Sequence, residues 1–254
     1  LGNPLLKAAG VQVEWTEETL QEYQRCWEDP QHFIENYIKI VHVDRGLVPF
    51  DMYGYQKKMI QTFMDDRFVI CKMPRQTGKS TTIISFLLHY ILFNQDVNCA
   101  ILANKLSTAR ELLSRLQLAY ENLPKWMQQG VVIWNKGNIE LENGSKILAA
   151  ATSSSAVRGS SFNIIFLDEF AHVPNNIADQ FFTSVYPTIS SGETTKVFIV
   201  STPLGLNMFY KMWIDAEEGR SNYTPIDVHW SEVPGRDEKW KQETIKNTSE
   251  QQFN

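Results

Sequence analysis

Apolar and polar positions along the chain follow two different periods. Nearly continuous apolar runs, which are typical of strands buried on both faces of a parallel sheet, occupy residues 68–71, 97–103, 164–167 and 196–200. Apolar residues at helical spacing occupy residues 16–40, 55–66, 81–93, 107–123 and 207–218. Because strands alternate with helices, the pattern predicts an α/β fold with a mainly parallel sheet flanked by helices.

A different pattern covers residues 131–151. Three short runs typical of strands, at 131–134, 139–141 and 146–150, are separated by Asn135-Lys136-Gly137-Asn138 and by Asn143-Gly144. Such Asn- and Gly-rich pairs favour the tight turns of β-hairpins. The segment therefore predicts a small β-meander inserted before the strand at 164–167.

The composition is that of an ordinary globular protein. The chain has 254 residues, of which 43% are hydrophobic and 21% are charged. That is enough for one large α/β domain or two small ones, with a core that needs neither disulfides nor metal. The three cysteines, Cys26, Cys71 and Cys99, are an odd number without ligand spacing. We expect Cys71 and Cys99 to be core residues, in a protein from a reducing, intracellular setting.

Charge and hydropathy narrow the class further. The net charge is −5, without the basic surplus that is usual in proteins that bind nucleic acid permanently. Any contact with DNA is therefore expected to be local and transient. No apolar run has the roughly 18 residues that a membrane span needs, and no signal peptide opens the chain. We expect a protein that is neither secreted nor membrane-spanning.

Candidate chemistry begins at residues 73–80, Met-Pro-Arg-Gln-Thr-Gly-Lys-Ser. Gly78, Lys79 and Ser80 form the end of a phosphate-binding P-loop, placed between a predicted strand and a predicted helix as this motif requires. Backbone N–H groups at the helix start point toward phosphates, and the helix dipole favours their charge. Lys79 would reach the β- and γ-phosphates, and the Ser80 hydroxyl would bind Mg²⁺. Met73 stands where the usual motif has its first glycine.

A second motif follows the apolar run at 164–167, where two carboxylates, Asp168 and Glu169, end the predicted strand. Open α/β sheets place ligands at the carboxyl ends of their strands. This is the Walker B arrangement, in which Asp168 would hold Mg²⁺ and Glu169 would orient and deprotonate the attacking water. A P-loop and a Walker B motif in this order predict an ATPase.

Further motifs surround these two. They are Tyr55-Gln56, the early P-loop arginine Arg75, Val157-Arg158-Gly159, Ser201-Thr202-Pro203 and residues 205–210. The ordered set resembles the large terminase subunit of tailed phages, the motor that packages DNA into proheads, and is most similar to the T4-like branch. The resemblance implies a P-loop ATPase of the additional-strand, catalytic-glutamate type. Another strand then lies between the two Walker strands, and the strand at 196–200 is the candidate.

The resemblance also implies roles for single residues. Gln56 would bond the adenine edge and Tyr55 would stack on the base or pack beneath it. Thr202 would sense the γ-phosphate, and Arg158 would act in trans on the nucleotide of the next subunit. The implied nucleotide-binding set is Tyr55, Gln56, Arg75, Gln76, Thr77, Gly78, Lys79, Ser80, Thr81 and Thr202. The implied catalytic set is Glu169, Lys79, Arg158 and Arg75, and the implied Mg²⁺ ligands are Ser80 and Asp168.

Several of these residues also fit other roles. Arg75 fits stabilisation of γ-phosphate charge, pairing with a carboxylate as a switch, or plain solvent exposure. Arg158 also fits a structural ion pair, and Thr202 fits a turn cap. His172 is expected to be a satisfied polar residue at a strand end, and Asn207 to cap the helix that it precedes.

The resemblance extends to domains and partners. We expect residues 1–50 to be an N-terminal helical segment packed on the core, 51–230 to be the ATPase core, and 231–254 to begin a C-terminal helical subdomain or linker. The family's nuclease domain is expected to be absent, which would make this chain a motor fragment. Implied partners are double-stranded DNA held transiently, the portal protein, the small terminase subunit and the nuclease domain of the full-length protein. An assembled ring, a monomer in isolation and a place in the host cytoplasm during viral assembly are also implied.

Two rival functions remain at this point. A helicase-type ATPase of superfamily 2 would share both Walker motifs and an upstream glutamine, but it needs a second α/β domain, for which 254 residues leave no room. A nucleotide-dependent assembly module would bind ATP with negligible turnover. Glu169 argues against the second rival, because such a module has no need of a general base.

Overall fold

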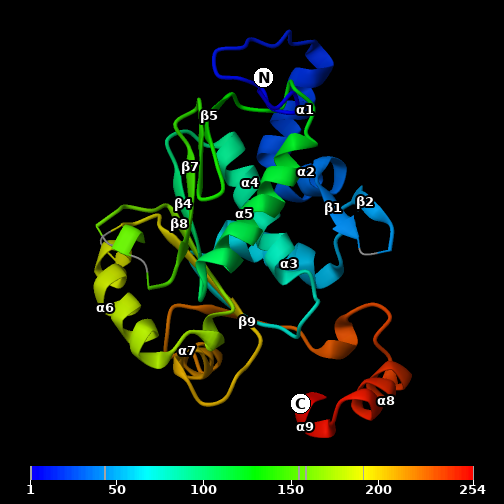
Figure 1. The fold of residues 1–254 in the computed structure, drawn as a ribbon, viewed down its shortest axis with the longest axis vertical. Helices are drawn as coiled ribbons and strands as arrows, with labels where there is room; N and C mark the ends of the chain where they lie inside the picture. Colours follow the sequence, from blue (N-terminus) through cyan, green and yellow to red (C-terminus); the bar gives the residue numbers. More distant parts are fainter. Residues whose placement is uncertain (1, 43, 154, 158, 191, 254) are drawn as a thin grey trace.

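A wide β-sheet forms the centre of the molecule in the computed structural model, which describes residues 2–42, 44–153, 155–157, 159–190 and 192–253 (Figure 1). Its strands are β3 (Phe68–Lys72), β4 (Asn98–Ala103), β5 (Val131–Trp134), β6 (Asn138–Leu141), β7 (Lys146–Ala151), β8 (Ile164–Asp168), β9 (Lys196–Ser201) and β10 (Thr224–Asp227). Their order is β10-β3-β9-β8-β4-β7-β6-β5. Neighbours run parallel from β10 to β7 and antiparallel from β7 to β5, which confirms the mainly parallel sheet.

Two sequence predictions concern the strand order. β9 lies between β3 and β8, so the additional strand between the two Walker strands is confirmed. The meander is present as well, but it widens the main sheet instead of standing apart, because β7 pairs in parallel with β4 along its whole length. Its inward side chains, Ile139, Leu141 and Ile147, are buried in the core. Burial of these apolar residues explains why the meander is built into the sheet.

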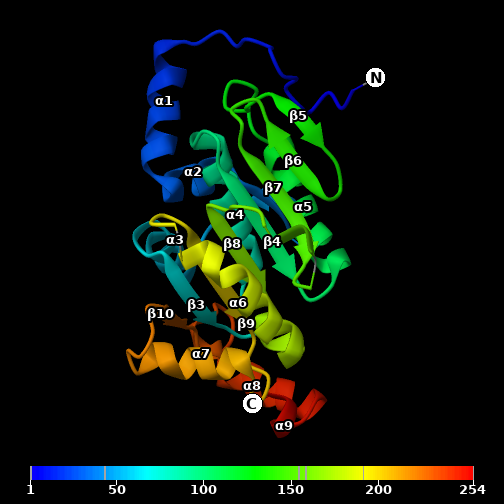
Figure 2. The same cartoon turned by 90° about the vertical axis from the view of Figure 1, so that its left-hand side faces the viewer.

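Helices cover both faces of the sheet (Figure 2). They are α1 (Glu17–Glu28), α2 (Pro30–Tyr37), α3 (Gly54–Asp65), α4 (Lys79–Phe93), α5 (Leu106–Glu121), α6 (Asn175–Ser190), α7 (Met208–Glu217), α8 (Glu238–Asn247) and α9 (Glu250–Phe253), with short 3₁₀ helices η1 (Ser155–Val157), η2 (Phe170–His172) and η3 (Trp230–Glu232). Buried residues of α1 to α5 form one apolar cluster, and those of α6 and α7 form a second. β3 lies between them, since Val69 and Cys71 join the first cluster and Ile70 the second.

The helical pattern predicted over residues 16–40 is wrong at its C-terminal end. α2 begins where the Asp29 side chain accepts a hydrogen bond from the His32 N–H and Pro30 occupies the first turn. After α2, β1 (Lys39–His42) pairs with β2 (Gly46–Pro49) in an antiparallel hairpin. These strands and β10 have only four residues each and lack the Asn- and Gly-rich turn sequences that mark the equally short β5 and β6, so the pattern predicts neither this hairpin nor β10.

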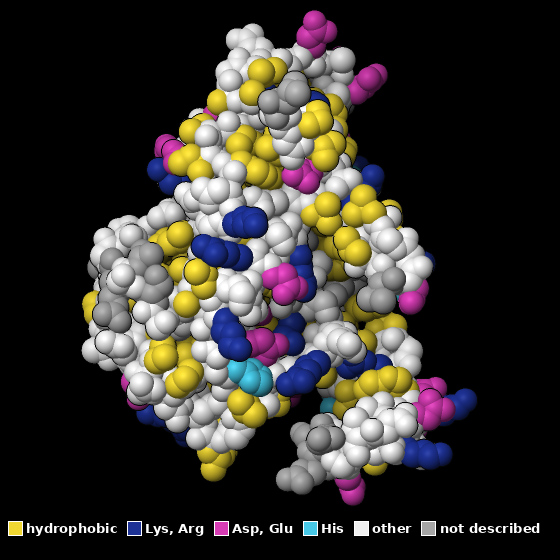
Figure 3. Space-filling model, viewed as in Figure 1, with side chains coloured by type: hydrophobic (Ala, Val, Ile, Leu, Met, Phe, Trp, Pro, Cys, Tyr) yellow, Lys and Arg dark blue, Asp and Glu magenta, His cyan; other side chains and the backbone are white. Residues whose placement is uncertain are grey.

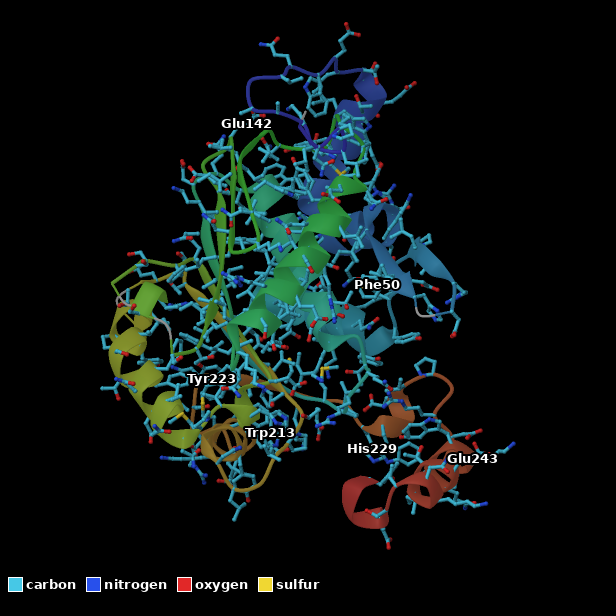
Figure 4. All side chains as sticks on the ribbon, viewed as in Figure 1. Phe50, Glu142, Trp213, Tyr223, His229 and Glu243 are labelled. Atoms are coloured by element: carbon cyan, nitrogen blue, oxygen red, sulfur yellow. The ribbon has the colours of Figure 1, made fainter. Side chains whose placement is uncertain are left out.

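The two ends of the chain lie at opposite ends of the molecule (Figure 1). The N-terminal segment is tied to the meander by Glu142, which accepts hydrogen bonds from the backbone N–H of Gly10 at 2.9 Å and of Gly130 at 2.7 Å (Figure 4). The C-terminal helices α8 and α9 project from the opposite end of the molecule (Figure 1).

The structure also bears on the predictions about the cysteines and about membrane spans. All three cysteines are buried, so Cys71 and Cys99 are confirmed as core residues. Within the described part of the chain, no helix is long and apolar enough to cross a membrane.

Candidate active site

The predicted P-loop joins β3 to α4, which begins at Lys79. Gly78 has a φ of 71°, a left-handed conformation that favours glycine, and a Cβ there would lie 2.5 Å from the Gln56 amide nitrogen. Gln76 is also left-handed, with a φ of 58°. Strained conformations at non-glycine residues cluster at functional sites. The loop therefore packs directly against Gln56 at Gly78, where a side chain would not fit.

The structure brings the two Walker motifs into contact. The Ser80 hydroxyl donates to Asp168 Oδ1 at 2.9 Å, across 88 positions of sequence. Asp168 is only 4% exposed, and this burial raises the pKa of its carboxyl to about 6, against the opposing effect of the Ser80 bond. Two oxygen-bearing side chains therefore meet at the carboxyl end of β8.

Glu169 follows β8 in a left-handed conformation, with a φ of 48°, and both of its carboxylate oxygens have partners. The Lys79 ammonium lies 2.8 Å from Oε1, and the Thr202 backbone N–H and hydroxyl donate to Oε2 at 3.1 and 3.0 Å. Burial raises the pKa of Glu169, but the Lys79 charge and the Thr202 bonds outweigh it and hold the pKa below its ordinary value. The carboxylate is therefore ionised at neutral pH.

His172 extends this cluster. It ends η2, and its Nε2 lies 3.0 Å from the Thr202 hydroxyl oxygen and 3.6 Å from Glu169 Oε2. The expectation of a satisfied polar residue is confirmed, and the partner is a residue of the predicted site. Asn207 is confirmed as the cap of α7, since its side chain accepts from the Tyr210 N–H.

A cleft of about 500 Å³ opens in front of these groups. It is lined by Arg75, Gln76, Lys79, Ala103, Asn104, Lys105, Thr108, Asp168, Glu169 and His172. On the face shown in Figure 3, Lys and Arg side chains gather around carboxylates and a histidine. The mixture of cations and carboxylates suits a polyphosphate bound together with a cation.

Several of the predicted site residues do not line the cleft. Those that are not among its lining residues are Tyr55, Gln56, Thr77, Gly78, Ser80, Thr81 and Thr202. Arg75 lines the cleft with an exposed side chain. Arg158 lies outside the described residues, so its role stays a prediction.

Tyr55 and Gln56 brace the P-loop. The Tyr55 hydroxyl donates to the Thr77 carbonyl oxygen at 2.8 Å, and the Gln56 amide donates to the same oxygen at 3.0 Å. The Gln56 carbonyl oxygen accepts from the Tyr53 N–H at 2.8 Å. Both side chains thus have protein partners, and their contact with adenine stays a prediction.

Sequence reasoning missed several neighbours of the site. Asn104, Lys105 and Thr108 line the cleft because β4 ends beside β8, and the rule that ligands gather at strand carboxyl ends would have indicated them. Arg236 donates to the carbonyl oxygens of Arg75 and Gln76 at 2.9 and 3.1 Å. No local pattern marks Arg236, because only tertiary folding brings it to the loop.

A Gly-Lys-Ser loop and an Asp-Glu pair that meet at the carboxyl ends of parallel strands define the class of P-loop nucleotide-binding folds. Residues 70–254 match the family model described as terminase large subunit, T4likevirus-type, N-terminal. Because the match spans most of the chain, the protein belongs to the terminase large-subunit family of the T4-like type.

Solved structures show the same fold. The HK97 bacteriophage large terminase is 18% identical with a TM-score of 0.74, over 89% of this chain and 53% of that one. The Thermus phage P74-26 large terminase ATPase domain is 17% identical with a TM-score of 0.68, over 80% of this chain and 91% of that one. A thermophilic bacteriophage's large terminase in complex with ADP is 14% identical with a TM-score of 0.59, over 77% and 50%. The chain thus spans about half of the HK97 protein.

Proposed function

We propose that this chain is the ATPase motor domain of a phage terminase large subunit. It hydrolyses ATP to ADP and phosphate with Mg²⁺, and hydrolysis drives double-stranded DNA into a prohead. The observation that carries the proposal is the meeting of Lys79, Ser80, Asp168 and Glu169 at one end of the parallel sheet. Family membership supports the packaging role, and the terminase in complex with ADP supports a nucleotide as the ligand.

The Lys79–Glu169 ion pair accounts for how nucleotide binding prepares the site. A phosphate that enters the cleft competes with Glu169 Oε1 for the Lys79 ammonium. Once Lys79 moves to the phosphate, the pKa of Glu169 rises toward its ordinary value and Oε1 becomes free to accept a proton from water. Oε2 stays bonded to Thr202, which keeps the base in place.

The donor set fits Mg²⁺. A hydroxyl and a carboxylate 2.9 Å apart, Ser80 Oγ and Asp168 Oδ1, are hard oxygen ligands of the kind that Mg²⁺ takes beside nucleotide phosphates. When bound, the ion neutralises phosphate charge. Binding of the ion requires the ionised form of Asp168, so the raised pKa of this carboxyl opposes binding at low pH.

The remaining assignments follow the family. Arg75 lines the cleft and would stabilise γ-phosphate charge, Arg158 would complete the site of the next subunit in a ring, and Thr202 would couple the γ-phosphate to β9. Double-stranded DNA, the portal protein, the small terminase subunit and the nuclease domain of the full-length protein would be the partners. The division into residues 1–50, 51–230 and 231–254 is part of the same proposal.

Phosphate release by two matched variants tests the proposal. Glu169→Gln should bind ATPγS and Mg²⁺ but lose ATP turnover by about 10²–10⁴-fold, because only proton acceptance is removed. Asp168→Asn should lose Mg²⁺-dependent nucleotide binding as well. Retention of most activity by Glu169→Gln would contradict the proposal.

Mixing inactive subunits tests the role of Arg158. An Arg158→Ala chain keeps an intact pocket, and a Glu169→Gln chain keeps an intact arginine. If Arg158 acts in trans, mixtures that co-assemble should regain ATPase activity, since such an arginine is worth about 10³-fold or more. Absence of rescue in co-assembled mixtures would place Arg158 in its own subunit's site or in a structural role.

A further inference from the structure

His172 is one of the cleft residues that neither the family motifs nor the proposed mechanism uses. It lies 30 residues from Thr202 in sequence, yet its Nε2 is 3.0 Å from the Thr202 hydroxyl oxygen. The side chain is 30% exposed and lines the cleft. A partly exposed histidine can satisfy its ring nitrogens with water, so its contact with a residue that holds Glu169 needs an explanation.

The direction of the hydrogen bonds follows from valence. The Glu169 carboxylate pairs with the Lys79 ammonium at 2.8 Å and acts as an acceptor, so the single Thr202 hydroxyl hydrogen goes to Glu169 Oε2 at 3.0 Å. The Thr202 oxygen must then accept from His172, which means that Nε2 carries the ring hydrogen. The result is a chain of donors from His172 through Thr202 to the carboxylate.

We propose that His172 is a positioning residue for ATP hydrolysis: by donating to Thr202 Oγ1 it keeps the Thr202 hydroxyl hydrogen directed at Glu169. This inference rests on the proposed function of the cleft. Without His172, the Thr202 hydroxyl can rotate and donate elsewhere, because nothing else in the bonds described for Oγ1 fixes its hydrogen. Glu169 Oε2 would keep the Thr202 N–H at 3.1 Å, while the one hydroxyl hydrogen of Ser201 has a shorter bond at 2.8 Å to the Thr202 carbonyl oxygen. The base would remain present but would be less well oriented.

The surroundings of His172 leave a second possibility to exclude. Arg75, Lys79 and Lys105 line the same cleft, so a nucleotide phosphate bound there also comes near the ring. A direct contact with nucleotide predicts loss of affinity, whereas positioning through Thr202 predicts loss of rate at unchanged affinity.

Three variants in the full chain separate these roles. His172→Ala should lower kcat by at least about tenfold, with KM for ATP and the calorimetric Kd for ATPγS changed by less than about twofold. His172→Gln, whose amide N–H can still donate to Thr202, should stay within about threefold of the unmodified kcat. His42→Ala, in the β1–β2 hairpin, which supplies none of the described residues that line the cleft, is the matched control and should leave kcat unchanged.

A double-mutant cycle with Thr202→Val completes the test. If His172 acts through the Thr202 hydroxyl, His172→Ala should cause no further loss of kcat in the Thr202→Val background. Additive losses, equal losses in His172→Ala and His172→Gln, or a loss seen only in Kd would each overturn the inference. An unchanged kcat in His172→Ala beside an inactive Glu169→Gln would overturn it while the proposed function stands. Full activity of Glu169→Gln would overturn both.

Discussion

Two titratable side chains of helix α4, Lys79 and His89, have opposite surroundings. At its start Lys79 pairs with Glu169, a carboxylate at the edge of an open cleft. Ten residues later the His89 ring donates through Nε2 to the Cys26 carbonyl oxygen at 2.8 Å, and the ring contacts those of Phe33 and Phe93. Because a backbone carbonyl can only accept, His89 Nε2 carries the hydrogen in this bond.

The difference lies in whether the partner can be exchanged. In the proposed mechanism a phosphate replaces Glu169 as the partner of Lys79, so this part of α4 would serve binding and release. Burial lowers the pKa of His89 to about 4 and keeps it neutral, and its backbone partner has no competitor. Variants near the cleft should therefore change activity, and variants near His89 should change stability.

The largest effect is expected at the cleft end. Lys79→Ala removes a charge that serves both the bound nucleotide and the transition state, so kcat/KM should fall by about 10³-fold or more. A phosphate-release assay measures the loss of turnover, and calorimetric titration with ATPγS measures the loss of nucleotide affinity. The melting temperature of Lys79→Ala should change little. A large drop would mean that Lys79 also stabilises the fold, which would contradict the contrast with His89.

The second-largest effect is expected in the packing around His89. Phe33 is fully buried and contacts the rings of His89 and Phe93, so Phe33→Ala should lower the free energy of unfolding by about 3–5 kcal/mol. Denaturant melts measure this loss. At a temperature where the variant is folded, its affinity for ATPγS should match that of the unmodified chain, and weaker binding would couple the two ends.

A pH dependence sharpens the same contrast. The pKa of His89 is lowered from 6.5 to about 4, so between these values the unfolded chain binds more protons than the folded one. Stability from this group is complete above pH 6.5 and falls as the pH drops toward 4, by about 3 kcal/mol in total. His89→Gln should flatten that part of the stability profile, and an equally steep profile in the variant would contradict the assignment.

The smallest effect concerns a second paired carboxylate, Glu22 of α1. Its Oε1 accepts from His32 at 2.6 Å and from the Tyr37 hydroxyl at 3.0 Å. Burial raises the pKa of Glu22, but these two partners outweigh it and lower the pKa below 4.5. The stabilisation is therefore present above pH 4.5 and is lost as the pH falls through the lower folded value. Glu22→Gln should lower the free energy of unfolding by about 1 kcal/mol and leave ATPase activity unchanged. A loss of ATPase activity would contradict the view that Glu22, unlike Glu169, serves stability alone.

The elements that sequence predicts well are those with a long or continuous signal. The four core strands of 68–72, 98–103, 164–168 and 196–201 lie where the apolar runs place them, because strands buried on both faces consist of nearly continuous apolar residues. The contact of Ser80 with Asp168 follows from the same pattern, since both motifs end at the carboxyl edge of one sheet.

The parts that sequence does not predict depend on contacts between distant residues. Gln56 and Tyr55 face the Thr77 carbonyl, although their motif indicates only nucleotide contact. The partner of His172 is set by β9 lying beside β8, and Arg236 reaches the P-loop from 160 positions away. Hydrogen-bond partners at such separations leave no periodic trace along the chain.

The exchange of partners by Lys79 is the central claim, and the ATPγS affinity of Glu169→Gln tests it most directly. Glutamine keeps the size of the side chain but removes the charge that holds Lys79 at 2.8 Å. Calorimetric titration with ATPγS and Mg²⁺ should therefore show binding at least as tight as in the unmodified chain, with ATP turnover lost. Clearly weaker binding of ATPγS would mean that Lys79 and Glu169 are fixed structural partners, and would contradict the account.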